Sequence, residues 1–446
     1  MRVRVVRNRY VDSVRLMKVA ADMRSRDGVT SCEAVMGTPA NLAALGLECD
    51  AGPADVVLAV DGPEEALDAA EQALTAAKED AAERPDAAPR SLVAAEANVA
   101  LISVPGEYAV LEAHRALTCG MHVFLFSDHV GVEDEIALKR RGAERGLLVM
   151  GPECGTAMLG GIGLGFANVV RAGSVGIVAA AGTGAQEASV LLDRAGAGVS
   201  QIVGVGGRDL SADVGGIMFR QGIERLAADE DTETLLLVSK PPDPDAVAAL
   251  GDVDAGGKRV VAAFVGWHGG EAPFEVHPTL EAGAHAAAAP FTRRGYVPPG
   301  HTPKGHAPQG HAPLLGLFSG GSLAYEAQTI LGPGHRILDL GDEEYTQGRP
   351  HPMVDLELRR RMLREDGPAA GCVLLDVVLG YGSHPDPAGE LAETLAELEC
   401  PVIAHVCGTD ADPQDAGRQE AILREAGVHV APTNAAAARL AKAVVG

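Results

Sequence analysis

A strand that breaks into glycines and restarts as a helix constrains this chain more than any other feature. Residues 174–181 form a short apolar run that predicts a buried parallel strand. The run ends at the turn 182–184, and an amphipathic helix pattern continues to Gly196. Thr183 and Gln186 have the spacing of a capping box. Because a helix N-terminus offers free N–H groups and a positive dipole end, the stretch predicts either a phosphate site or an ordinary strand–helix turn.

The composition places the chain among α/β proteins and narrows its partners. Its 446 residues suggest about three domains, and 55 glycines with 3% aromatic residues are typical of an α/β composition. A net charge of −24 argues against nucleic acid or an anionic membrane as partner. Seven cysteines without a C-x-x-C pair favour a reduced compartment over disulfides or a zinc site. With no signal-peptide or membrane-span pattern, the sequence predicts a cytoplasmic protein without a metal.

Strands and helices alternate along most of the chain, which predicts parallel sheets with ligands beyond the strands' carboxyl ends. The predicted fold class is a multidomain α/β protein with a small N-terminal unit, a Rossmann-like domain and two flavodoxin-like domains. The expected boundaries are 1–92 for the N-terminal unit and linker, 93–172 for the Rossmann-like domain, 173–284 and 314–446 for the flavodoxin-like domains, and 285–313 for a linker.

The segment 285–313 is of low complexity and places three histidines five residues apart, at His301, His306 and His311. Its proline and glycine content favours an extended linker of polyproline II character. Weak metal binding by the histidines is the alternative.

The glycine turn occurs twice. Residues 181–188 read Ala-Gly-Thr-Gly-Ala-Gln-Glu-Ala, and residues 320–327 read Gly-Gly-Ser-Leu-Ala-Tyr-Glu-Ala. A glycine, a hydroxyl residue and the Ala, Glu and Ala positions coincide, and apolar strand patterns follow both stretches in the same order. A duplicated phosphate-type site explains this better than a chance repeat of a generic turn.

Several polar side chains follow predicted strands. Arg208 and Lys240 come just after two strands of the first repeat, and Arg349 and His351 lie in a proline-restricted segment of the second. The candidate substrate-binding residues beside them are Gly207, Asp209, Gly341 and Asp342. A lone basic residue is more often a solvated loop charge, but two beside a glycine turn favour an anion site. For His351, a rigid connector is the alternative.

Together these segments resemble a known family. Gly151-Pro152-Glu153-Cys154, the Gly182-Thr183 turn and residues 206–209 are similar to the α subunit of succinyl-CoA synthetase, and residues 314–446 resemble the carboxyl-terminal domain of its β subunit. A closer resemblance, over nearly the whole chain, is to the FdrA family. Its segments are seen in 12–14, 36–41, 127–128 with 133–135, 206–210, 239–242 and 348–353.

The chain departs from the synthetases in three ways. It has no segment of ATP-grasp size, and it has no Gly-His-Ala-Gly histidine; the corresponding region offers Trp267-His268-Gly269-Gly270. The glycine-rich CoA loop expected at the first strand is replaced by residues 6–10. Ligase chemistry and CoA binding are therefore disfavoured.

The FdrA resemblance implies a subunit of an oxamate carbamoyltransferase in ureide (allantoin) breakdown, acting with two other subunits. The substrates would be carbamoyl phosphate and oxamate, or oxalurate and phosphate in reverse, with no certain cofactor. Phosphate would be held by Gly182, Thr183, Gly184, Gly320, Gly321 and Ser322. Arg208, Lys240 or Arg349 would clamp the anions, and His351 would polarise the carbonyl or move a proton.

Two other functions are compatible with the same residues. One is an acyl-CoA synthetase subunit that needs a separate ATP-grasp partner. The other is a non-catalytic subunit that binds a phosphorylated metabolite. A homo-oligomer is compatible with each of them.

Overall fold

The computed structural model describes residues 1–9, 11, 13–24, 26, 28–76, 92, 95–291, 313–346 and 349–446. Most of the predicted linker, with His301, His306 and His311, lies outside the described residues, as does Gly348. By contacts the chain forms two units. The first comprises Met1–Glu96 and Leu340–Leu358, and the second comprises Ala97–Asp339 and Arg359–Gly446.

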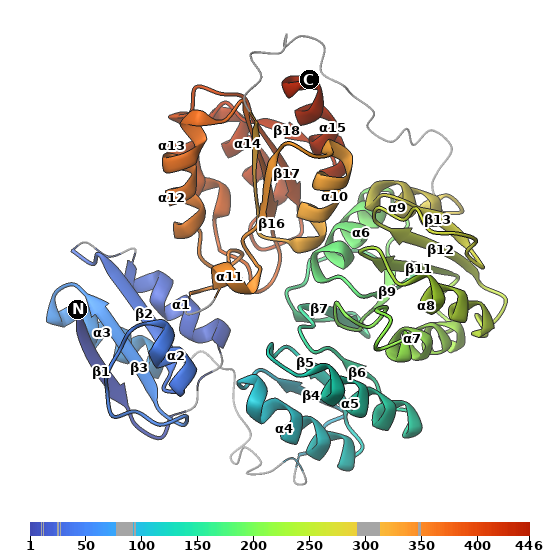
Figure 1. Cartoon of the computed structure of the whole chain (residues 1–446), viewed down its shortest axis with the longest axis horizontal. Helices are drawn as coiled ribbons and strands as arrows, with labels where there is room; N and C mark the ends of the chain where they lie inside the picture. The colour runs from blue at the N-terminus through green and yellow to red at the C-terminus, as the bar shows by residue number, and fades with distance from the viewer. Residues whose placement is uncertain are drawn as a thin grey trace. The chain divides into compact units, whose positions relative to one another are not determined.

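The first unit is built on a three-stranded antiparallel sheet in the order β1-β3-β2. Its elements are β1 (Arg2–Val6), α1 (Ser13–Arg24), β2 (Ser31–Met36), α2 (Pro39–Ala44), β3 (Val56–Asp61) and α3 (Glu64–Ala76) (Figure 1). Leu58 and Val60 of β3 and Leu74 of α3 are fully buried in its core. This is the predicted small N-terminal α/β unit. The segment 340–358, with α11 (Glu343–Thr346), packs with it.

The second unit begins with the predicted Rossmann-like rhythm. Three parallel strands lie in the order β4-β5-β6. The elements are β4 (Val99–Ile102), α4 (Gly106–Thr118), β5 (His122–Leu125), α5 (Val132–Glu144) and β6 (Val149–Met150).

The first glycine turn belongs to a seven-stranded sheet in the order β13-β12-β11-β9-β10-β7-β8. Its parallel part holds β9 (Ala172–Ala179), α6 (Gly182–Arg194), β10 (Val199–Gly204), α7 (Ile217–Ala228), β11 (Thr234–Ser239), α8 (Pro244–Ala249), β12 (Arg259–Phe264), β13 (Glu275–His277) and α9 (Leu280–Ala288). The hairpin β7 (Thr156–Leu159) and β8 (Ile162–Gly165) extends this sheet, with β7 antiparallel to β10. This hairpin was not among the elements expected from the sequence pattern.

The second glycine turn belongs to a five-stranded parallel sheet in the order β15-β14-β16-β17-β18. Its elements are β14 (Leu314–Phe318), α10 (Gly321–Leu331), β15 (Arg336–Asp339), α12 (Glu357–Asp366), β16 (Cys372–Val378), α13 (Pro387–Ala396), β17 (Val402–Cys407), α14 (Ala416–Glu425), β18 (His429–Ala431) and α15 (Asn434–Val445).

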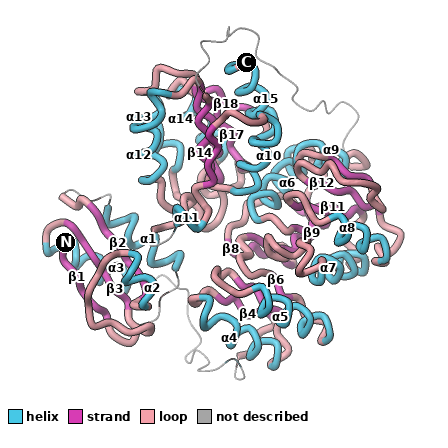
Figure 2. The backbone as a smooth tube through the Cα atoms, in the orientation of Figure 1, coloured by secondary structure: helices cyan, strands magenta, loops and turns pink. Residues whose placement is uncertain are grey.

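The two parallel sheets share one topology. Numbered along the chain, both have the strand order 2-1-3-4-5 of flavodoxin-like folds, so the predicted duplication extends to whole domains. In each, one pair of helices covers one face: α6 with α9, and α10 with α15. Figure 2 shows further helices on the opposite faces, which explains why β11, β16 and β17 are buried along their whole length. The predicted α/β fold class is confirmed. No helix in the described part of the chain combines the length and apolarity needed to cross a membrane.

Candidate functional site: two facing helix N-termini

The first glycine turn forms a helix start without a side-chain cap. The helix α6 begins at Gly182, and Ala181 precedes it in extended conformation. The predicted capping box is therefore wrong, because Thr183 is already the second helical residue. Gln186 instead donates through Nε2 to Asn168 Oδ1 at 3.1 Å and to the carbonyl oxygen of Leu379 at 3.4 Å.

The two turns predicted to hold phosphate meet in the structure. A methyl group built on Gly320 would lie 2.6 Å from the Thr183 hydroxyl oxygen, and one on Gly184 would lie 3.4 Å from Ser322 Cβ. Thr183 and Ser322 are 7% and 3% exposed. The absence of side chains at the glycines thus allows the starts of α6 and α10 to touch.

The first turns of both helices keep unused N–H groups. Among the described residues, no acceptor bonds the N–H of Gly182, Thr183 or Gly184, nor that of Gly321 or Ser322. The dipoles of α6 and α10 place partial positive charge at these two turns.

The strand–turn ahead of α10 already holds a protein carboxylate. Asp376 accepts from Ser319 N at 2.8 Å, Ser319 Oγ at 3.0 Å and Gly320 N at 3.0 Å. Arg359 pairs with the same carboxylate at 2.8 Å, and both side chains are almost fully buried. No local sequence pattern predicts this ion pair, which holds the strand–turn before α10 and leaves Gly321 and Ser322 for a ligand.

Lys240 lies beside the second turn, as its place after β11 predicts. A methyl group on Gly321 would lie 3.2 Å from Lys240 Nζ and 2.3 Å from Asp339 Oδ2. Lys240 is exposed and forms no ion pair with any carboxylate that the structure describes. Its positive charge is therefore available at the start of α10.

The other predicted residues of the first repeat lie elsewhere. Arg208 pairs with Glu135 at 2.9 Å and donates to the carbonyl oxygen of Val130. Asp209 is fully buried, pairs with Lys139 at 2.7 Å and accepts from the first N–H groups of α7. Gly207 is exposed beside them. These contacts join α5 to the first flavodoxin-like domain and do not reach the facing turns.

The remaining predicted residues belong to the first unit. Gly341, Asp342, Arg349 and His351 lie in the segment that packs with the N-terminal residues. His351 Nδ1 accepts from Met353 N at 3.2 Å. An ion pair between Arg24 and Asp355 anchors the segment to α1. Burial raises the pKa of Glu33, with Arg24 and Arg349 opposing that rise.

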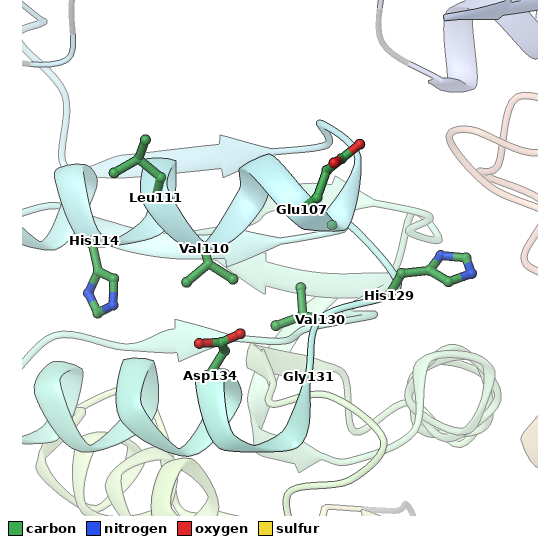
Figure 3. Close-up of a pocket in the computed structure, with 9 residues that line it drawn as sticks. Glu107, Val110, Leu111, His114, His129, Val130, Gly131 and Asp134 are labelled. Carbon is green, nitrogen blue, oxygen red and sulfur yellow. The ribbon is translucent and has the colours of Figure 1, made fainter. Parts of the chain in front are cut away.

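A pocket of about 420 Å³ lies between α4 and α5 in the Rossmann-like part. Figure 3 shows Val110 and Val130 with Asp134 around this space, while His129 projects away from it. Glu107 and Asp134 line it, and neither lysine nor arginine does. Such a lining disfavours the binding of phosphate groups in this pocket.

Comparison with known proteins agrees with this architecture. A family model described as CoA-ligase matches residues 317–444, and one described as AllF, heavy metal-associated domain, matches residues 1–91. The fold and the paired glycine turns thus define a succinyl-CoA synthetase α-like protein of the CoA-ligase type.

Sequence relatives narrow this class. YahF of Escherichia coli K12 is 35% identical over 98% of this chain and 96% of its own length. The chain belongs to the FdrA family, as its motifs predicted. The α-2 subunit of the ADP-forming succinate–CoA ligase of Trichomonas vaginalis is 31% identical over 38% of this chain and 56% of that subunit. The solved structure of PH0766 from Pyrococcus horikoshii OT3 aligns over 80% of this chain and 86% of its own, with a TM-score of 0.37 and 16% identity.

The description of the N-terminal match raises the question of a heavy-metal site. Residues 1–91 contain no histidine and two cysteines, Cys32 and Cys49. Burial raises the pKa of Cys32 to about 11, which disfavours the thiolate that binds metals. No cluster of three metal-ligating side chains occurs in the described ranges. The residues present do not fit a heavy-metal ion.

Proposed function

We propose that this chain is a subunit of an oxamate carbamoyltransferase that acts in the cytoplasm in ureide breakdown. It would interconvert carbamoyl phosphate and oxamate with oxalurate and phosphate. The observation that carries the proposal is the pair of facing helix N-termini at Gly182–Gly184 and Gly320–Ser322. Among the described residues, their first N–H groups have no acceptor, and Lys240 beside them has no carboxylate partner.

These groups suit a phosphate that arrives on the substrate. Backbone N–H groups and a lysine bind phosphate oxygens and stabilise the charge that grows on the leaving group. The chain lacks the Gly-His-Ala-Gly histidine that a phosphorylated-enzyme route would need. The proposed reaction therefore does not pass through a phosphoryl group on the protein.

The bond changes balance without a covalent enzyme intermediate. The amide nitrogen of oxamate attacks the carbamoyl carbon and forms a C–N bond. The bond from that carbon to the phosphate oxygen breaks, and phosphate leaves with the electron pair. The proton lost from nitrogen passes to phosphate or water. The facing turns act on the phosphate throughout.

The chain would work as one part of an assembly with small anionic substrates. Two further subunits are expected from the FdrA resemblance, and the succinate–CoA ligase relatives are themselves named as subunits. We assign no cofactor.

An acyl-CoA ligase-like activity with a separate ATP-grasp subunit is the second candidate. The CoA-ligase model that matches residues 317–444 favours it, and the missing Gly-His-Ala-Gly histidine counts against it. ADP formation that depends on CoA would distinguish this activity from carbamoyl transfer.

Two alanine substitutions test the phosphate site in the assembled complex, with oxalurate and phosphate as substrates. Gly321→Ala places a methyl group against Asp339 and Lys240, so we expect turnover to fall about a hundredfold through misplacement of the turn. Gly270→Ala is the matched control, because Gly270 lies outside the facing turns and its added methyl group would meet nothing within 4 Å, and it should retain most activity.

Equal turnover in the Gly321→Ala and wild-type complexes would remove the α10 turn from the site. Stabilisation of the complex by carbamoyl phosphate without any turnover would support a non-catalytic binding subunit instead.

A further inference from the structure

The glutamates that coincide in the two repeats are not used by the proposed chemistry. Glu187 and Glu326 are each the sixth residue of their helices, α6 and α10. At a rise of 1.5 Å per residue they lie about 7 Å along the axis from the helix start. Both are 1% exposed. A buried carboxyl repeated at the same helix position needs its own explanation.

Each glutamate binds the start of a helix in the opposite domain. Glu187 of α6 accepts at Oε1 from Asn434 N, in the first turn of α15, at 3.3 Å. Glu326 of α10 accepts at Oε1 from Leu280 N, in the first turn of α9, at 2.7 Å. The two contacts are therefore related by the internal repeat.

Asn434 joins both glutamates. Its side-chain amide donates to Glu326 Oε2 at 2.8 Å and to the carbonyl oxygen of Leu323 at 3.0 Å, while its backbone N–H binds Glu187. Asn434 is fully buried. Asn434 thus links the second turn of α6 to the first two turns of α10 by hydrogen bonds.

Other ionisable groups surround this crossed pair. His405 Nε2 lies 2.7 Å from Glu187 Oε2. Burial alone would raise the pKa of Glu187, but the neighbouring His405 outweighs burial and the pKa is lowered. Burial raises the pKa of Glu326 to about 7, and the neighbouring Glu187 and Glu281 add to the rise. His285 of α9 also faces Glu187 and Glu281, and burial lowers its pKa.

We propose that Glu187, Glu326 and Asn434 are positioning residues that set how closely the N-terminal turns of α6 and α10 approach each other. They do not touch the anion themselves. They fix the two helices through the opposite domain, and the turn geometry follows from that. The effect on anion binding rests on the proposed phosphate site, whereas the effect on the turns does not.

The yield of an engineered disulfide reports how close the first turns of α6 and α10 lie to each other, and no ligand is needed for this measurement. Because a methyl group on Gly184 would lie 3.4 Å from Ser322 Cβ, the double substitution Gly184→Cys with Ser322→Cys has a spacing close to that of a disulfide. We expect this bond to form in the full-length chain under mild oxidation. Adding Asn434→Ala or Glu326→Ala should lower its yield severalfold.

Glu281→Gln is the matched control. Glu281 lies at the same domain contact, where it binds Thr433 Oγ1 at 2.9 Å and Arg439, and it does not bind the turns. It should leave the disulfide yield unchanged. An unchanged yield in folded Asn434→Ala and Glu326→Ala chains, judged by circular dichroism, would overturn the proposal.

Sulfate binding to the full-length chain gives the second readout, because its charge is constant near neutral pH. We expect wild-type affinity to fall as pH rises from 6 to 8 and Glu326 ionises, and Glu326→Gln to bind as wild type does at pH 6 with a flat profile. A Glu326→Gln profile that follows wild type would overturn the role of Glu326. If wild type binds no sulfate while the disulfide yields change as expected, the proposed phosphate site fails and the positioning role stands.

Discussion

At the scale of single residues, buried charge is used to join elements. Lys139 is fully buried, and its ammonium lies 2.6 Å from Glu135 and 2.7 Å from Asp209. It also donates to the carbonyl oxygen of Val205. Breaking a buried pair leaves an uncompensated charge, whereas an exposed pair contributes little.

Lys139→Met should therefore destabilise the chain by about 3–5 kcal/mol. The control is Arg171→Met, since the Arg171 side chain is 57% exposed beside Asp193; its cost should be below about 1 kcal/mol. Urea unfolding of both variants checks this. Similar urea midpoints for the two variants would contradict the conclusion that the buried ion pairs of Lys139 stabilise the contact between α5 and the first flavodoxin-like domain.

Residue identity alone predicted charges near strand ends but not their partners. Lys240 lies at the facing turns, as expected, while Arg208 is bound to Glu135 and Val130. Both follow a strand of the same sheet. Their different roles depend on α5, which is distant in sequence, packs against α7 and carries the Glu135 that binds Arg208.

At the scale of elements, a glycine turn determines where each helix starts. The hydroxyl at Thr183 suggested a cap, but the glycine before it lets the helix begin one residue earlier. The turns then approach closely because Gly184 and Gly320 have no side chains. The local sequence pattern predicted the helix α6 and its buried face. The contacts of its first turn depend on α10, the helix that faces it.

Burial of the Glu326 carboxyl group makes stability depend on pH. Because the pKa of Glu326 is raised to about 7 from an ordinary 4.5, the folded state holds its proton over a range where the unfolded chain has lost it. The stabilisation is fully present below pH 4.5 and is lost as pH rises through 7. Its size is about 3 kcal/mol.

We therefore expect the free energy of unfolding to fall between pH 5 and pH 8, and the fall to be smaller in Glu326→Gln. Denaturant unfolding at several pH values measures this difference. Parallel pH profiles for the two proteins would show that Glu326 does not titrate in this range.

At the scale of the molecule, the N-terminal unit matches a metal-associated family, but its described residues hold no cluster of three metal-ligating side chains. We expect the full-length chain to retain no stoichiometric Zn²⁺ or Cu⁺ that depends on its thiols. Metal analysis after dialysis, compared with a Cys32→Ser and Cys49→Ser variant, tests this. A metal equivalent present in wild type and lost in that variant would show a thiolate site.

The sequence by itself determined the alternation of strands and helices, the two glycine turns and the duplication, because these are local patterns. The common strand order of the two sheets follows from that repetition. Tertiary structure alone decided that the segment 340–358 packs with the N-terminal unit and that Asn434 binds both Glu187 and Glu326. Such contacts join residues over a hundred positions apart. A single sequence carries no local signal for them, since they depend on how whole elements pack.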